Sequence, residues 1–302
     1  MNGANVQIAT LSKQDIEFAQ RVRRRNEQRR LIGLLLPGGA WLLLFFVLPL
    51  VIIVIYSFLR RSATGDIDWS FSLSNYVLLF TEPLYLTIFW RSLWIALLTT
   101  ALTLLIGYPL TFFIARQSPR RRVMLVFAIM IPFWTNFLVR IYAWRFLLNN
   151  TGLINMVLES MGFAPVALIN TPAAVLIGLI YGELPYMVLP LYAAFERVDW
   201  TLLEAAQDLG ANRARALLHV LLPLTLPGIV AGSILVFVPT VGAFVVPQLL
   251  GGAKVAMIGS VLERQFLSAQ NQPFGSAIAL VFMLLLTTLI LIYFRATPEE
   301  SR

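Results

Sequence analysis

The chain has 302 residues, of which 59% are hydrophobic and 13% are charged, whereas apolar residues make up about 45–50% of an ordinary soluble domain. It has no Cys and a single His, His219, which excludes disulfides, Cys-ligated metals and His-rich metal sites. The formal net charge is +8. In so apolar a chain, an excess of basic residues is better explained by the charge of cytoplasmic loops in a membrane protein than by nucleic-acid binding. We therefore expect an integral membrane protein with no metal site and no nucleic-acid partner.

The N-terminal segment 1–30 is basic, and its arginines are spread over the stretch from Ser12 to Arg30. This stretch is polar on all sides, which indicates a helix at the anionic lipid surface of the cytoplasmic leaflet. A simple positive-inside anchor is the alternative. The apolar run that follows begins too late and is too long for a signal peptide, and Arg60 and Arg61 stand where a cleavage site would be expected. We predict an uncleaved first span.

Apolar windows of about 20 residues predict an all-α polytopic membrane protein, with six helices in a transmembrane domain over residues 31–296 and a tail at 297–302. The predicted spans are 31–59, 88–115, 123–148, 171–195, 224–250 and 276–294.

The distribution of basic residues predicts the orientation of these spans. Sixteen of the 23 Lys and Arg residues lie in the two tails and in the 116–122 and 196–218 loops, which share one side of the membrane, and four lie in the opposite loops. Cytoplasmic loops carry the excess of positive charge. Both termini are therefore expected in the cytoplasm.

Prolines interrupt the third, fourth and fifth predicted spans. Each removes a backbone donor, so the freed carbonyl must be satisfied by neighbouring helices or by water in a cavity. Such spans favour a moving pathway over a static anchor. The prolines concerned are Pro132, Pro185, Pro190, Pro239 and Pro247.

The cytoplasmic loop 196–223 has the sequence of two short capped helices. Thr201 and Glu204 have the spacing of a capping box, which predicts a helix beginning at Thr201. Gly210 can take the left-handed conformation that ends a helix, and Asn212 can then cap a second helix. An ordinary helix-turn-helix connection between two spans would also fit this pattern.

This loop resembles the EAA loop of ABC importer permeases, whose pattern is E-A-A-x3-G-x9-I-x-L-P. The matching residues are Glu204-Ala205-Ala206, Gly210, Val220 in place of Ile, and Leu222-Pro223. The resemblance implies a type I ABC importer permease fold, in which the loop forms a coupling helix that sits in a cleft of a separate ATPase subunit. The ATPase-coupling residues that it implies are Glu204, Ala205, Ala206, Asp208, Gly210 and Arg213.

Further short motifs resemble the spermidine/putrescine branch of these permeases, and within it the first of two different permease subunits. They are Gly107-Tyr108-Pro109, Pro132-Phe133-Trp134-Thr135-Asn136, Arg140-Ile141-Tyr142, Gly152-Leu153-Ile154-Asn155, Leu189-Pro190-Leu191-Tyr192 and Leu249-Leu250-Gly251-Gly252.

The branch implies a permease subunit of the bacterial inner membrane that forms, with a second homologous permease, the path for a polyamine. The implied partners are an ATPase subunit in two copies, a periplasmic substrate-binding protein and membrane lipid. No G-x4-G-K-[ST] motif occurs in the sequence, so ATP and magnesium are expected in the ATPase, and the chain itself is expected to bind no cofactor and to hold no catalytic residue.

Glu183 is the leading candidate for a residue that lines the substrate path. It is the only carboxylate inside a predicted span and lies twelve residues from Thr171, about 18 Å deep. Such a charge usually faces a bundle interior or an aqueous cavity and could meet an ammonium group. The alternative is a structural ion pair with Arg140. The other path candidates are the aromatic residues Trp134, Tyr142, Tyr181 and Tyr186, which could make cation–π contacts, and Asn136.

The sequence leaves the substrate and the transporter class open to alternatives. Close polyamine permeases often carry acids where this chain has Ala243 and Gln248, so another small amine, an opine or an amino-acid-like solute is an alternative substrate. A secondary transporter without an ATPase would account for Glu183 but not for the capped loop. An intramembrane hydrolase using Ser233 would need a base within reach, and His219 is the only histidine.

Overall fold

The structure is a computed structural model that describes residues 35–62 and 65–296, so the basic segment 1–30 and the tail 297–302 lie outside the described residues. The chain divides into two compact units, residues 1–56 and 57–302. An apolar helix runs over Leu35–Ser57, all of it in the first unit except Ser57, and includes η1 (Leu43–Val47) and α2 (Leu48–Ser57). This helix is long enough to cross a bilayer, as predicted for the first span.

In the second unit the described residues form helices, their connections and one short hairpin. Strands β1 (Arg60–Arg61) and β2 (Ile67–Asp68) pair antiparallel, with Arg60 opposite Asp68. Helices α3 (Ser74–Thr81), α4 (Pro83–Ala115), α8 (Pro172–Phe195) and α14 (Gln272–Ala296) follow along the chain, with the remaining elements between them. Among the described residues five helices are long and apolar enough to span a membrane, or six if one bent pair counts as a span. The predicted second, fourth and sixth spans correspond to α4, α8 and α14.

The predicted third span is not one straight helix. Helix α5 (Pro119–Met130) continues into the 3₁₀ turn η2 (Ile131–Trp134), and the chain then bends by 91° into α6 (Phe137–Leu147). Two local causes account for the break: Pro132 lies in the 3₁₀ turn, and the Asn136 side chain caps α6 by accepting from the Leu138 N–H at 2.8 Å.

The helix that corresponds to the predicted fifth span begins and ends earlier in the sequence than the predicted range 224–250. The continuous helix runs over Arg213–Val241 through α10 (Arg213–Ala216), the π-helical η3 (Leu217–Leu221) and α11 (Leu222–Val241). It stops at Gly242, and α12 (Val245–Gly251), which carries Pro247, is a separate short helix. The segments η4 (Gly252–Lys254), α13 (Ile258–Glu263) and η5 (Arg264–Ser268) then lead to α14.

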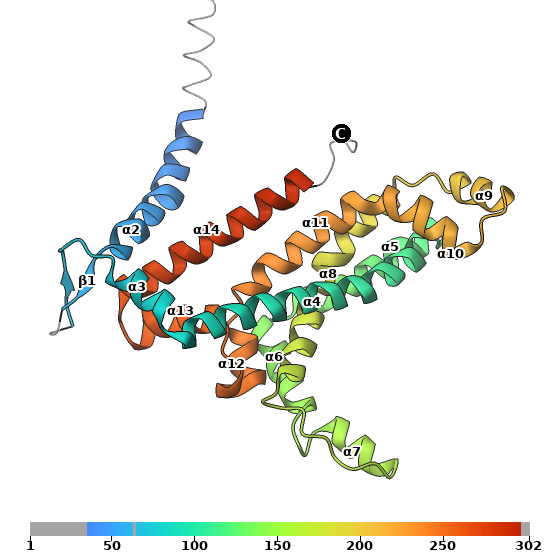
Figure 1. Cartoon of the computed structure of the whole chain (residues 1–302). Coiled ribbons are helices and arrows are strands. Elements are labelled where there is room, and N and C mark those ends of the chain that lie inside the picture. Colours follow the sequence, from blue (N-terminus) through green and yellow to red (C-terminus); the bar gives the residue numbers. More distant parts are fainter. Residues whose placement is uncertain (1–34, 63–64, 297–302) are drawn as a thin grey trace, which may run out of the picture. The chain divides into compact units, whose positions relative to one another are not determined.

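The core of the second unit forms where α4, α8 and α11 run side by side, as Figure 1 shows. Helix α11 approaches α8 closely at two glycines four residues apart. A Cβ atom on Gly228 would lie 2.6 Å from the Ala194 Cβ, and one on Gly232 would lie 2.8 Å from the Met187 Sδ. Small residues at this spacing let helix backbones come close, which is how membrane helices gain packing energy.

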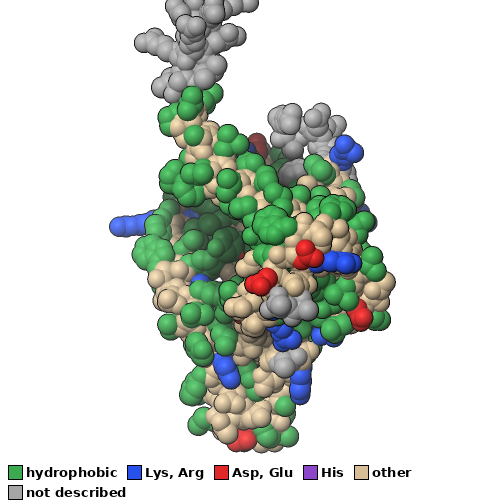
Figure 2. All heavy atoms as spheres, turned by 90° about the vertical axis from the view of Figure 1, so that its left-hand side faces the viewer, with side chains coloured by type: hydrophobic (Ala, Val, Ile, Leu, Met, Phe, Trp, Pro, Cys, Tyr) green, Lys and Arg blue, Asp and Glu red, His purple; other side chains and the backbone are tan. Residues whose placement is uncertain are grey.

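The outer surface is largely apolar. Figure 2 shows hydrophobic side chains over most of one face, with scattered charges. Trp90 and Leu105 of α4, for example, are 70% and 68% exposed. Apolar surface of this extent is typical of contact with lipid or with other membrane subunits. The chain therefore has the architecture of a polytopic membrane protein.

Candidate functional site

The loop after α8 contains a short helix and the start of a second one, joined at a glycine as the sequence predicts, but the second helix is not short, because it continues to Val241. Helix α9 (Thr201–Asp208) ends where Gly210 takes a φ of +90°. The Ala211 N–H donates to the Ala206 carbonyl at 3.0 Å and the Gly210 N–H to the Gln207 carbonyl at 2.9 Å, the two bonds of a Schellman motif. Asn212 then caps α10, accepting from the Arg215 N–H at 2.8 Å.

The predicted capping box at the start of α9 is wrong in detail. Thr201 is already the first residue of the helix, and its hydroxyl donates a hydrogen bond where the capping box needs it to accept one. The acceptor is the Asp199 carboxylate, 2.8 Å from the Thr201 hydroxyl and 3.0 Å from its N–H. These two bonds lower the pKa of Asp199, so this cap is intact at neutral pH and weakens as pH falls through the lowered pKa.

Helix α9 presents most of the expected coupling residues at the surface. Glu204, Ala205, Asp208, Gly210 and Arg213 are exposed, and Ala206 is half-buried. Leu209, at the end of α9, is 90% exposed, and Leu202 is 46% exposed. Exposed apolar groups among charged ones are typical of a surface that a partner covers.

Glu183 and Arg140 are both partly buried, but they do not form the ion pair considered from the sequence. Within the described ranges, the recorded ion pair joins Arg122 to Glu196 at 3.9 Å. The Glu183 Oε2 atom and the Arg140 Nε and Nη1 atoms are buried without a hydrogen-bond partner. The Arg140 guanidinium instead lies over the Phe133 ring, with its Cζ 4.6 Å from the ring centroid. An aromatic face therefore takes the place of the carboxylate.

The aromatic path candidates lie in two different settings. Tyr181 packs against Trp144 at a centroid distance of 5.4 Å, and Tyr186 packs against Phe133 at 5.3 Å. Since Glu183 lies between these two tyrosines on α8, the ring pairs flank it along the helix. The other candidates are not drawn into this group: Trp134 and Tyr142 are exposed, and Asn136 is used in the cap of α6.

The structure adds a carboxylate that sequence reasoning missed. The Gln248 side-chain amide of α12 donates to the Glu263 Oε2 of α13 at 2.9 Å. Fifteen residues separate the two in sequence, and no local spacing indicates the pairing. The Gly228 and Gly232 contact was also missed, although its four-residue spacing was a readable signal.

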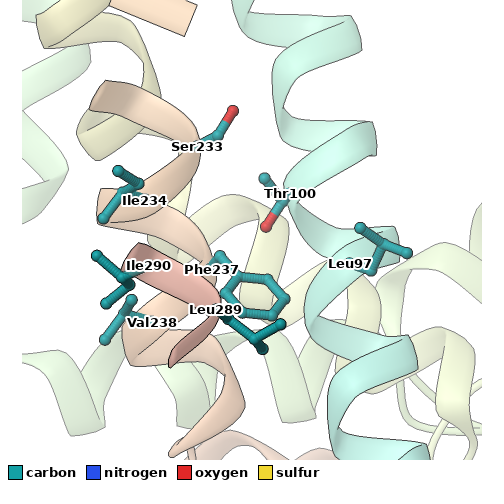
Figure 3. Close-up of a pocket in the computed structure, with 8 residues that line it drawn as sticks. All are labelled: Leu97, Thr100, Ser233, Ile234, Phe237, Val238, Leu289 and Ile290. Carbon is teal, nitrogen blue, oxygen red and sulfur yellow. The ribbon is translucent and has the colours of Figure 1, made fainter. Parts of the chain in front are cut away.

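An apolar cavity of about 260 Å³ lies between α4, α11 and α14 and includes Ser233 in its wall. Figure 3 shows Ser233 and Thr100 on different helices among aliphatic side chains and the Phe237 ring. His219 lies on η3, fourteen residues before Ser233 in the same continuous helix and thus about 21 Å away along its axis. A serine–histidine pair is therefore excluded. The lining residues are Leu97, Thr100, Ser233, Ile234, Phe237, Val238, Leu289 and Ile290.

Comparison with known proteins identifies relatives over most of the chain. The family model described as "Binding-protein-dependent transport system inner membrane component" matches residues 107–297. The spermidine/putrescine transport system permease protein PotB of Haemophilus influenzae is 44% identical over 265 residues, which cover 87% of this chain and 92% of that protein. PotB of Escherichia coli K12 is 41% identical over 259 residues, covering 85% and 94%.

A solved structure shares the fold. A chain of a bacterial ABC transporter involved in the import of the acidic polysaccharide alginate superposes with a TM-score of 0.69 at 17% identity, covering 94% of this chain and all of that one. At this identity the likeness concerns the fold alone.

Proposed function

Because the chain belongs to the binding-protein-dependent transport system inner membrane components and has the fold of type I ABC importer permeases, we propose that it is a permease subunit that imports a polyamine such as spermidine or putrescine. The single observation on which the choice of substrate rests is the sequence identity of 41–44% to two PotB proteins over nearly their whole length. The exposed, capped helix α9 supports an ATP-driven mechanism, since a secondary transporter has no use for it.

The partners in this proposal are two copies of an ATPase subunit, a second permease and a periplasmic substrate-binding protein. The exposed residues of α9 contact the ATPase, which holds ATP and magnesium, and the present chain binds neither and catalyses no reaction. Residues 31–296 form the permease domain, with both termini in the cytoplasm of a bacterium and segment 1–30 at the lipid surface.

The substrate path in this proposal follows the face of α8 that carries Glu183. Because the Glu183 Oε2 atom has no hydrogen-bond partner, this carboxylate can accept an ammonium group without first breaking an ion pair. Tyr186, three residues after Glu183 and so on the same face, offers a ring to the rest of a cationic substrate. Tyr181, two residues before Glu183, points to another side of α8, where its ring packs on Trp144. The Glu263 carboxylate beside Gln248 supplies a second negative charge outside the spans. These charges favour a cationic amine over an anionic solute.

Co-purification followed by an ATPase assay tests the proposal. The chain is expressed with its genomic neighbours, and the purified complex is expected to contain an ATPase and to hydrolyse ATP faster when the loaded binding protein is added. Spermidine or putrescine is expected to give the strongest stimulation. A complex without an ATPase would indicate a secondary transporter. If an amino-acid-like solute or an opine stimulates ATP hydrolysis and polyamines do not, the proposed substrate is wrong.

A further inference from the structure

Helix α9 contacts the rest of the second unit closely on one side and sparsely on the other. On one side it continues through Gly210 and α10 into η3, which it contacts, and so into α11. On the side of α4 and α5 a cavity of about 250 Å³ lies next to it, and Leu203, Glu204 and Gln207 line the α9 wall of this cavity. No residue of α9 is fully buried. Because the cavity lies between α9 and α4, few α9 side chains pack directly on α4, although Leu203 packs against the buried cluster that includes Ala115 and Phe195.

Trp200, the residue before α9, bridges to α4 and α8 at the edge of this cavity. Its ring stacks on Phe195 at the end of α8, at 6.4 Å and 8° between the planes. The Phe112 ring of α4 meets it edge-on at 6.0 Å. The Arg116 guanidinium lies over both rings, 6.0 Å from Trp200 and 5.6 Å from Phe112. Stacking and cation–π contacts therefore fix the indole from three directions.

The α4 residues in this contact form a stripe that also reaches α11. Tyr108 and Phe112 of α4 and Arg116, the residue directly after the helix, are spaced four residues apart and so lie on one side of it. Tyr108 packs on Phe195 at 5.2 Å, and its hydroxyl shares a hydrogen bond of 3.0 Å with the Thr225 hydroxyl of α11. One stripe of α4 thus joins the start of α9 to α8 and α11.

We propose that Trp200, fixed by Arg116, is the positioning residue through which movement of α9 drives α4 and α8. This inference rests on the proposed function, in which the ATPase moves α9. Close-packed side chains shift together, so a displaced indole must displace Phe112 and Phe195 or lose its contacts with them. Gly210 and Asn212 carry the same movement to α11, and Trp200 carries it to the other two core helices.

The test compares transport with ATP hydrolysis in proteoliposomes that contain the complete complex and the binding protein. Trp200→Leu removes the ring and leaves the exposed face of α9 unchanged, so ATPase association and hydrolysis are expected to persist. The amount of substrate imported per ATP is expected to fall about two- to thirtyfold, the range by which mutations along a coupling network change coupling. Trp200→Phe, which keeps a stacking ring, should restore most of this ratio. Trp90→Leu, at an exposed tryptophan near the other end of α4, is the matched control and should leave the ratio unchanged.

Arg116→Gln and Arg116→Lys keep the proposal testable if Trp200→Leu does not assemble. Arg116→Gln is expected to lower the ratio and Arg116→Lys to preserve it, because only Lys keeps a cation over the rings. The proposal is overturned if uptake and hydrolysis fall in proportion or if neither changes. Failure of the proposed function is a different result: the wild-type complex would then lack ATP-driven polyamine uptake altogether.

Discussion

At the scale of single residues, Glu183 is a half-buried carboxylate, and Arg140, its expected cationic partner, lies over the Phe133 ring instead. Arg140 is held by the Phe133 ring, so loss of the Glu183 charge should leave Arg140 undisturbed. Glu183→Gln keeps the shape of the side chain and removes only the charge. We expect uptake of the cationic substrate to fall while the yield of folded complex stays at the wild-type level, measured by an uptake curve and by size-exclusion chromatography of the complex.

Arg140→Met is the companion change for Glu183→Gln. If the two groups pair in the membrane, Glu183→Gln would strand a buried cation at a cost of about 3–5 kcal/mol and lower the complex yield. Recovery of both yield and transport in the Glu183→Gln, Arg140→Met double variant would then show that the cation path lies away from Glu183.

Gly210 is the second residue for which the structure predicts the effect of a substitution. A Cβ atom there would meet nothing within 4 Å, so a substitution tests the backbone conformation and not the available space. At a φ of +90° a β-branched side chain is strained by about 1–2 kcal/mol, which should misdirect α10. Gly210→Val is therefore expected to reduce uptake while membrane insertion stays normal. Gly39→Val, in an open helical position, is the control; wild-type uptake and ATPase binding in Gly210→Val would contradict a coupling role.

At the scale of helices, the contact between α11 and α8 depends on Gly228. A larger side chain there would press on the Ala194 Cβ and on the Pro190 carbonyl oxygen, which lies 2.7 Å from the position of a Cβ. Because backbone cannot rotate away, Gly228→Leu should separate the helices and destabilise the protein by about 1–3 kcal/mol. A lower melting temperature in detergent would report this. Ala231→Leu, at an exposed position on the same helix, should melt with the wild type; equal losses in both variants would show that the close approach is unimportant.

Counting apolar residues in windows of the sequence predicted the existence of the helices more accurately than the positions where they are interrupted. A window of about 20 apolar residues averages over the break at Thr135 and Asn136 and over the stop at Gly242, because the neighbouring residues stay apolar. The local signals were readable, since Asn136 is a common N-cap residue. The glycine stop at Gly210 and the cap at Asn212 were predicted correctly because each depends on residues a few positions apart, whereas the cap by Asp199 was missed. The contact between the Arg140 guanidinium and the Phe133 ring could not be predicted, because it depends on how α6 folds back at the bend.

At the scale of the whole molecule, the charge asymmetry and the bent pair together define a topology experiment. Three apolar helices, α8, α11 and α14, separate the loop at Gly162 from Arg302, so the two positions should lie on opposite sides of the membrane. The excess of basic residues in the 116–122 and 196–218 loops and in the tails predicts that Arg302 lies in the cytoplasm. A reporter that is active only in the cytoplasm should therefore work after Arg302 and fail at Gly162.

An N-terminal fusion then decides whether the bent pair crosses the bilayer. If α5, η2 and α6 together form one span, the first helix, α4 and the bent pair make three crossings before Gly162, and a reporter ahead of Met1 should be active like the one after Arg302. If the 91° bend instead returns the chain to the side it left, there are only two crossings, and the N-terminal reporter should fail as the Gly162 reporter does. The arginines of segment 1–30 favour the first result, because a periplasmic N-terminus would carry seven basic residues across the membrane.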